Sequence, residues 1–406
     1  EAGAGEDIIP AQMARDTADP EASAPTIRFV NSLIERAFTE RASDIHLEPQ
    51  EGEMVVRMRI DGTIVDYVTL ERSVHQPLIA RIKIMANLDI AERRLPQDGH
   101  FRIRAGQEGH VNIRVSLLPT VFGEKAVLRI LAAAGHVDHA EHFGMDDDSY
   151  ARFLPMLNSP NGIIYLTGPI GSGKSTTLYM VLEYLSRRQV NISTVEDPVE
   201  QNVPGINQTQ VNPVAGLTFE SGLRALLRQD PDIIMVGETR DGETAGISVR
   251  AAITGHLVLS TLHTNDAVSS VVRLADMGVD RYLIANSLVG LVAQRLMRKV
   301  CPHCAREAAV TPQEQALLGR DIRTVRRGAG CMHCNGTGYR GRVAVHEIVA
   351  VDRSIRRMIS RGAEAEEIEA YAREHQGMKS LREKGLELVR EGVTTPEELL
   401  RIAYYA

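Results

Sequence analysis

The chain has 406 residues, enough for two to four domains, with 43% hydrophobic and 24% charged residues, as in an ordinary soluble protein. Its net charge of −7, its 4% aromatic content and the lack of Trp argue against a dedicated DNA-binding protein and against an aromatic stacking surface for single strands. No apolar run approaches the ~20 residues of a membrane span, and four cysteines are too few for a disulfide scaffold, which indicates a cytosolic protein.

The N-terminal third of the sequence predicts a tether followed by a small domain. Residues 1–26 are rich in Ala, Glu, Asp and Pro and are expected to be disordered. The chain opens on Glu1 without a signal-peptide pattern, as a trimmed N-terminus would. Helical apolar spacing then gives way to strand-like runs, two of which flank the hairpin turn Asp61-Gly62. We therefore expect an α+β domain at 27–131 and a linker at 132–148.

Residues 168–175, GPIGSGKS, match the phosphate-binding P-loop G-x-x-x-x-G-K-[ST] between a predicted buried strand and a predicted helix. The glycines let backbone N–H groups converge on a polyphosphate, and the helix N-terminus adds positive dipole. Lys174 is expected to reach the β- and γ-phosphates, and the Ser175 hydroxyl to hold Mg²⁺. The sequence thus predicts a nucleoside triphosphate site. Its expected contacts are Gly168, Pro169, Ile170, Gly171, Ser172, Gly173, Lys174, Ser175 and Thr176.

Acidic residues follow the next two apolar strands. Glu196, Asp197 and Glu200 come after one strand, and Glu238 comes after the other. Ligands of parallel sheets bind at the carboxyl ends of the strands, so these side chains are expected near the phosphates. Gly237 stands where a Walker B Asp would hold Mg²⁺, which leaves Glu238 as the catalytic carboxylate, Glu200 as a second candidate, and the other acids to complete the metal's outer shell. The alternative is that they are solvated charges at strand ends.

Residues 254–265, TGHLVLSTLHTN, place a strand between His256 and His263. A neutral histidine near a γ-phosphate can donate a hydrogen bond and register its loss after hydrolysis. The residues alone favour two structural histidines.

Paired cysteines dominate residues 300–345 in the pattern C-x2-C-x26-C-x2-C. Thiolates at such spacing close a tetrahedral Zn²⁺ site, and four sulfur ligands leave no open position, so the zinc is expected to be structural. His303 and His333 lie within the two pairs and could ligate instead. The expected ligands are Cys301, Cys304, Cys331 and Cys334.

The remaining residues, to 406, are predicted to be helical, with Thr395, Pro396 and Glu398 forming a capping box at the start of the last helix.

Four segments, taken together and in this order, resemble the motifs of the secretion ATPase superfamily. They are GPIGSGKSTT, TVEDPVE, LRQDPDIIMVGETRD and TGHLVLSTLHTN. Three segments in the first third of the chain narrow the resemblance to the assembly ATPases of type II secretion systems and type IV pili: SDIHLEP, RMRIDG and LPQDG. The resemblance covers residues 27–406. Ile170 and Thr239 depart from the common pattern without threatening the chemistry. In that family TVEDPVE is the Asp box and the segment from Gly255 to His263 is the His box, so the resemblance implies that Glu196, Asp197, His256 and His263 bind the nucleotide. The cysteine module favours assembly, because the pilus retraction members generally lack it.

The resemblance implies a fold class. It implies an α/β protein with a RecA-like P-loop core built on a parallel sheet, preceded by an α+β (PAS-like) domain and followed by a zinc module and C-terminal helices. The implied ranges of the last three parts are 149–299 for the core, 300–345 for the module and 346–406 for the helices.

The resemblance also implies a function: a cytoplasmic homo-hexameric ATPase that binds ATP, Mg²⁺ and Zn²⁺ and drives pseudopilus assembly and protein export. Inner-membrane platform proteins, a bitopic anchor and a polytopic protein, are the implied partners that hold it at the membrane. Acidic lipid is a further candidate partner, and nucleic acid is not expected. Arg57, Arg59 and Arg72 are the candidate arginines for the γ-phosphate, the alternative being surface charges.

Three other functions stay open on the sequence. One is a type IV pilus extension ATPase. The others are a DNA-translocating RecA-like ATPase and a non-catalytic nucleotide binder.

Overall fold

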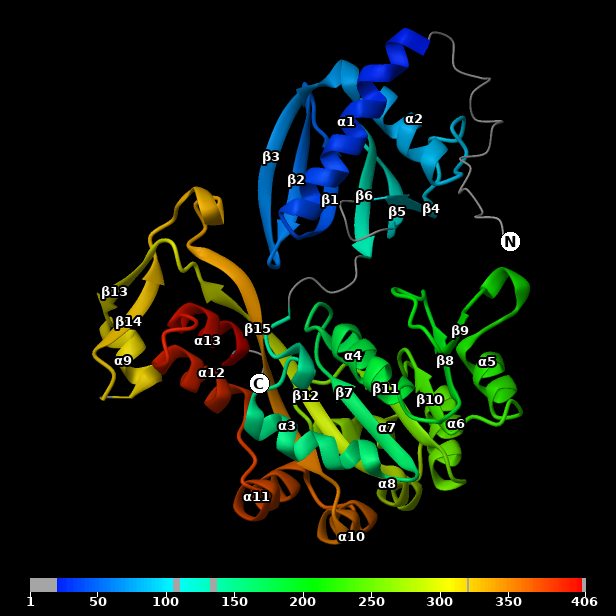
Figure 1. The fold of residues 1–406 in the computed structure, drawn as a ribbon, viewed down its shortest axis with the longest axis vertical. Helices are drawn as coiled ribbons and strands as arrows, with labels where there is room; N and C mark the ends of the chain where they lie inside the picture. The colour runs from blue at the N-terminus through cyan, green and yellow to red at the C-terminus, as the bar shows by residue number, and fades with distance from the viewer. Residues whose placement is uncertain (1–19, 105–109, 132–136, 320, 404–406) are drawn as a thin grey trace. The chain divides into compact units, whose positions relative to one another are not determined.

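The computed structural model describes residues 20–104, 110–131, 137–319 and 321–403 (Figure 1). The chain forms two compact units, Glu1–Gly135 and His136–Ala406. Most of the expected tether, 1–19, lies outside the described residues, whereas Pro20 already belongs to the first helix. In the described part of the chain, no helix combines the length and apolarity needed to cross a bilayer.

The first unit is an antiparallel sheet packed against two helices, with the described strands in the order β3-β2-β1-β6-β5-β4. Met54, Val56 and Met58 on β2 are buried in one core with residues of both helices, while Arg57 and Arg59 alternate with them on the other face. Asp61 and Gly62 both have positive φ, as the expected two-residue hairpin requires. The elements are α1 (Pro20–Thr39), β1 (Ala42–Pro49), β2 (Glu53–Ile60), β3 (Thr63–Glu71), α2 (His75–Met85), β4 (Gln97–Arg104), β5 (His110–Thr120) and β6 (Gly123–Leu131).

The second unit is built on a mostly parallel sheet. Its described strands have the order β15-β12-β7-β11-β10-β8-β9, and β15 alone runs antiparallel to its neighbour. These strands confirm the expected α/β core. They are β7 (Gly162–Thr167), β8 (Ile192–Glu196), β9 (Asn207–Gln210), β10 (Ile233–Val236), β11 (Leu257–Leu262), β12 (Leu288–Val300) and β15 (Tyr339–Ala350).

Helices cover both faces of this sheet, so its central strands are buried on both sides (Figure 1). On β7, Ile163 and Tyr165 pack in the core that includes α6 and α8, while Ile164 and Leu166 pack in the core that includes α3 and α4. The helices around the sheet are α3 (Asp147–Phe153), α4 (Lys174–Ser186), α5 (Phe219–Leu226), α6 (Gly242–Ile253), α7 (Ser269–Asp276), α8 (Arg281–Ser287), α10 (Arg353–Arg361) and α11 (Ala365–Gln376).

A small lobe interrupts the β12–β15 pair. It holds β13 (Ala305–Ala309), α9 (Pro312–Leu318) and β14 (Thr324–Gly328), and it packs on α12 (Leu381–Arg390) and α13 (Pro396–Ala403). β15 belongs to the central sheet although it runs across the boundary expected at 345/346.

The capping box expected at α13 is half wrong. The Glu398 N–H donates to Thr395 Oγ1 at 3.5 Å, as expected. The Glu398 carboxylate, however, accepts from the backbone N–H and the guanidinium of Arg298 on β12, at 2.7 to 2.9 Å. A buried carboxylate gains more from a guanidinium than from one more amide, so Glu398 ties the last helix to the sheet instead of capping it.

Candidate nucleotide site and cysteine cluster

The glycine-rich loop connects β7 to α4 and lies against β12. Gly168 and Gly173 have φ of 148° and 88°, which favours glycine. A Cβ on Gly168 would lie 2.5 Å from the Gln294 carbonyl oxygen, and one on Gly173 would lie 2.8 Å from Gln294 Nε2. A Cβ on Gly171 would meet nothing within 4 Å. The loop therefore needs glycine where it touches the sheet, and it is open at Gly171.

Lys174 begins α4 and is buried within the loop. Its Nζ donates to the carbonyl oxygens of Gly168 at 2.7 Å and Pro169 at 3.0 Å. Burial and the nearby charge of Arg295 lower the pKa of Lys174 to about 8, and Glu238 acts in the opposite direction. A polyphosphate bound in the loop would offer this ammonium the anionic partner that its surroundings lack.

The other loop residues differ in exposure. The Ile170 side chain is 84% exposed, and Ser172 is buried. Ser175 is exposed at the start of α4, and Thr176 is half-buried behind it. An accessible hydroxyl oxygen suits Mg²⁺, which prefers oxygen ligands, so the predicted role of Ser175 fits the place where the structure puts it.

Gln294 on β12 supports the loop from beneath. Its Nε2 donates to the Ser172 carbonyl at 3.0 Å, and its Oε1 accepts from Thr177 Oγ1 at 3.0 Å. Sequence reasoning missed this residue. The available signal was a lone amide within the apolar run LVGLVAQRLM, because a buried amide needs partners.

Glu238 and His263 lie at the same sheet edge as the loop, because β11 pairs with both β7 and β10 in parallel. A Glu238 oxygen is 2.5 Å from Arg240 and the other is 3.6 Å from His263 Nε2. Thr261 Oγ1 donates to the Gly237 carbonyl at 2.8 Å and so holds the end of β10 to β11. The fold thus brings together the two residues that the sequence placed 25 positions apart.

Arg240 and Thr264 were also missed. The proximity of Glu238 raises the pKa of Arg240, with a smaller contribution from Asp197. The Thr264 N–H donates to Thr167 Oγ1 at 2.8 Å, which links the residue after His263 to the end of the P-loop strand. Arg240 could have been found from its place two residues after Glu238.

The first acidic segment divides into a buried and an exposed part. Glu196 is buried and accepts from Tyr179 Oη, from Thr194 Oγ1 at 2.5 Å and from Gln208 Nε2 at 3.1 Å. Asp197 and Glu200 are exposed beside it. Glu196 therefore anchors the end of β8, and the exposed pair is better placed to meet a metal's water shell.

His256 lies at the other end of β11 from His263. Its Nδ1 is 3.0 Å from the Ala251 carbonyl oxygen. At ~3.3 Å per residue, β11 separates the two histidines by roughly 20 Å. The fold therefore does not bring His256 to the loop of its own chain.

The three candidate arginines belong to the first unit. Arg57 lies 3.3 Å from Glu48 and 3.0 Å from Asp66. Arg59 donates to the Gly62 carbonyl at 2.9 Å, and Arg72 donates to the carbonyl of Glu51. Each guanidinium is held by acceptors within its own unit.

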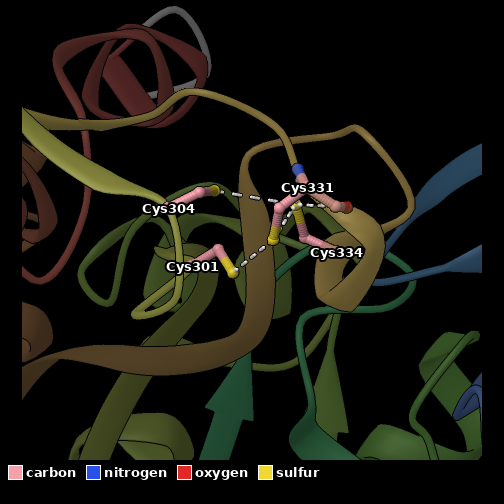
Figure 2. A group of neighbouring side chains, drawn as sticks. All are labelled: Cys301, Cys304, Cys331 and Cys334. Atoms are coloured by element: carbon pink, nitrogen blue, oxygen red, sulfur yellow. Dashed lines mark hydrogen bonds between the residues drawn. The ribbon is translucent and has the colours of Figure 1, made fainter.

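Four cysteines meet where β12 leaves the sheet and β15 enters it (Figure 2). The Sγ atoms of Cys301 and Cys331 are 3.9 Å apart, those of Cys304 and Cys334 3.8 Å, and those of Cys331 and Cys334 3.7 Å. Sulfurs bound tetrahedrally to zinc at ~2.3 Å are about 3.8 Å from one another. The residues present therefore fit Zn²⁺.

Backbone amides complete the cysteine cluster. The N–H groups of Cys331 and Gly338 each donate to Cys334 Sγ at 3.2 Å. Burial alone would raise the pKa of the Cys334 thiol, but these donors and the neighbouring thiols lower it to about 7. His303 and His333 stack on each other, with ring centroids 4.0 Å apart, and stand outside the ligand group found in the described residues.

Comparison with known proteins gives a match to one family model, to curated relatives and to solved structures. Residues 19–401 match the family described as type II/IV secretion system proteins. The chain is 48% identical over 404 residues to the type IV pilus assembly ATPase PilB of Thermus thermophilus, covering 97% of this chain and 45% of the relative. It is 48% identical over 388 residues to the type II secretion system protein HxcR of Pseudomonas aeruginosa, covering 95% and 79%.

A solved structure agrees on the fold. The X-ray structure of the Legionella pneumophila ATPase DotB has a TM-score of 0.68 at 20% identity, and the match covers 93% of this chain and 96% of that one. The chain thus spans nearly all of that protein, but less than half the length of the Thermus thermophilus relative.

Proposed function

The chain belongs to the type II/IV secretion system protein family and is an ATPase of that family, and from this premise we propose that it is the hexameric motor that drives pseudopilus assembly and export in a type II secretion system. One observation carries the proposal. The P-loop, Glu238 and His263 lie at the carboxyl ends of parallel strands of one sheet. Phosphate binding and a catalytic carboxylate are therefore available within one chain.

The proposed hydrolysis of ATP uses the residues at the carboxyl ends of these strands. The loop amides, the α4 N-terminus and Lys174 bind the β- and γ-phosphates. Glu238 accepts the proton of the attacking water, and His263 and Arg240 hold its carboxylate in place. Ser175, with Asp197 and Glu200 nearby, would hold Mg²⁺, which neutralises charge on the phosphates when bound. The four cysteines would hold a structural Zn²⁺.

Two alternatives are separated by a deletion experiment. We expect loss of the gene to abolish protein export and to leave surface pili intact. The 48% identity to a pilus assembly ATPase is consistent with a second candidate, pilus extension, for which pili would be lost and export kept. If DNA rather than acidic lipid stimulates the purified ATPase, a DNA translocase replaces both.

We propose that the arginines of the first unit complete the site once a ring forms. Arg57 and Arg72 are then the residues that reach the γ-phosphate, with Arg59 beside them. Arginine fingers contribute ~10³–10⁵ in rate, so truncating one costs far more than truncating a surface charge. Such a chain is nearly idle as a monomer, which prevents hydrolysis away from the secretion machine.

Turnover per chain should therefore rise with protein concentration as hexamers assemble. Arg57→Ala and Arg72→Ala should lose most activity while still binding ATP. Arg36→Ala is the matched control, since Arg36 on α1 is an exposed arginine of the same unit that pairs with its helical neighbour Glu40. Constant activity per chain down to a monomer shown by sedimentation would contradict the ring requirement.

Membrane partners follow from the same proposal. The motor works in the cytoplasm and is held at the inner membrane by the cytoplasmic domain of a bitopic anchor and by a polytopic platform protein. A pull-down from an inner-membrane extract should recover proteins of both kinds. Recovery of neither would leave the ATPase without its proposed machine.

A further inference from the structure

A second group of metal-ligating side chains lies at the start of the second unit, away from the cysteines. Glu141 and His142 lie on a turn of 3-10 helix, Ala140–His142, and His139 is the residue that precedes it. The rings of His139 and His142 stack, with centroids 6.4 Å apart and 9° between their planes. One nitrogen or oxygen from each of the three residues lies within 4.8 Å of the others.

The turn is held rigidly by its surroundings. The His142 ring stacks on Tyr150 at 4.2 Å, and Phe143 packs edge-on against Phe153 and Tyr184. His139 has φ of 54°, in the left-handed region, so the backbone reverses where the first ring projects. His142 is therefore preorganised for a metal, and bound metal would have to order only the exposed side chains of His139 and Glu141.

The chemistry of the three groups selects a class of metal. Two imidazoles and a carboxylate are ligands for zinc and the neighbouring first-row divalent ions, whereas Mg²⁺ and Ca²⁺ prefer oxygen throughout. His139 Nδ1 and a Glu141 oxygen are 3.9 Å apart, and two ligands of one zinc are ~3.3 Å apart, so a small movement of these exposed side chains would bring them to ligand distance. Both side chains are more than half exposed, which leaves room for a water as fourth ligand.

An acidic side chain lies beside His142 as well. The Asp147 carboxylate is 3.1 Å from His142 Nδ1, at an angle that makes no hydrogen bond. Metal-ligating histidines commonly donate their second ring N–H to a carboxylate, so a small rotation would let Asp147 fix the tautomer and leave the other nitrogen free to ligate.

We propose that His139, Glu141 and His142 form a second site for a first-row divalent transition metal, independent of the four cysteines and of the ATPase function. The site lies directly after the residues that join the two compact units. A bound metal would link the side chains of residues 139 and 142 and so cross-link the two ends of this turn.

The test is the zinc stoichiometry of the full chain. After dialysis against micromolar buffered free zinc, elemental analysis should find two zinc ions per wild-type chain. His139→Ala and His142→Ala should hold one, and Asp147→Asn should bind the second ion about tenfold more weakly. His375→Ala is the matched control, an exposed histidine stacked on Tyr371, and should keep two.

Cobalt distinguishes the sites when a variant folds badly. Titrating wild-type apoprotein with Co²⁺ should give intense thiolate charge-transfer bands from the cysteines and a separate weak band from a nitrogen and oxygen site. One zinc per wild-type chain, two zincs in His142→Ala, or a cobalt titration with only the thiolate species would each overturn the proposal.

Discussion

The nucleotide site and the cysteine cluster lie in the same unit, yet they are built in opposite ways. The cysteine ligands come from two short turns, each a C-x2-C pair, and the metal itself would hold the turns together. The nucleotide site draws on the ends of β7, β8, β10 and β11 and on the side of β12, so the sheet positions it. The comparison teaches that one site depends on local ligands and the other on strand register.

The largest effect should come from Lys174→Ala. Removing the ammonium leaves the β- and γ-phosphates without their buried cation, so ATP binding by calorimetry should fall below detection. Zinc content should stay at the wild-type value, because the cysteine turns do not involve α4. Wild-type ATP affinity in this variant would mean that the loop amides alone hold the nucleotide.

Glu238→Gln should bind ATP normally and turn over at least about a hundredfold more slowly, as loss of a positioned base does. The control is Glu243→Gln, an exposed residue of α6 paired with Arg224. Steady-state phosphate release measures both variants. Normal turnover in Glu238→Gln would move the catalytic role to another carboxylate of that edge, with Glu200 next in line.

Cys334→Ser tests whether the cysteine cluster depends only on its own turns. It removes a thiolate that two backbone amides support, so the structural zinc should be lost. Hydrogen exchange should then speed up first between residues 300 and 345, while ATP affinity changes little. If the P-loop loosened at the same time, the two sites would be one cooperative element.

Gln294→Ala should weaken the loop from below. It leaves the Ser172 carbonyl and the Thr177 hydroxyl without their buried partner, at a cost of about 1–3 kcal/mol in the free energy of unfolding. ATP affinity should also drop, by about tenfold, because the phosphate-binding amides of the loop lose the side chain that positions them, and tenfold corresponds to about 1.4 kcal/mol of binding free energy. Thermal denaturation with and without ATP separates the two contributions, and an unchanged melting temperature would rule out the supporting role.

The smallest effect is a pH dependence. The folded-state pKa of Lys174 is lowered to about 8 from 10.5, so the unfolded chain binds more protons between these values, and stability without nucleotide should rise with pH across that window. ATP needs the charged lysine, so its affinity should fall as pH rises through about 8. Calorimetry from pH 7 to pH 9 checks the sign, and a flat profile would contradict it.

The sequence alone was sufficient to predict those features that are formed by residues adjacent in the chain. The P-loop motif, the C-x2-C pairs and the Asp61-Gly62 hairpin each occupy a few positions, and the comparisons support the P-loop ATPase class. The α/β fold followed from alternating apolar strands and helices. Gln294 and Thr264 could not be assigned roles, because their partners are distant in the chain, and the registers 293↔167 and 262↔167 are what bring them to the end of the P-loop strand. Arg240 was overlooked although its partner Glu238 is only two residues away.

Glu398 and His256 show that a local sequence pattern can also mislead when distant residues decide the contacts. The local pattern at Glu398 predicts a capping box, but a guanidinium 100 residues away competes for its carboxylate. His256 and His263 look equivalent in the sequence, and only the direction of β11 places one beside Glu238 and the other at the opposite edge.

The resting position of Lys174 bears on how product leaves. Stripping a buried charge of its partner commonly costs about 3–5 kcal/mol, which would slow ADP departure by orders of magnitude. The carbonyl oxygens of Gly168 and Pro169 accept hydrogen bonds from this ammonium and could do so while the phosphates leave. These two carbonyl oxygens can replace the phosphate oxygens as hydrogen-bond acceptors. The Lys174 ammonium would therefore keep acceptors while nucleotide leaves and rebinds.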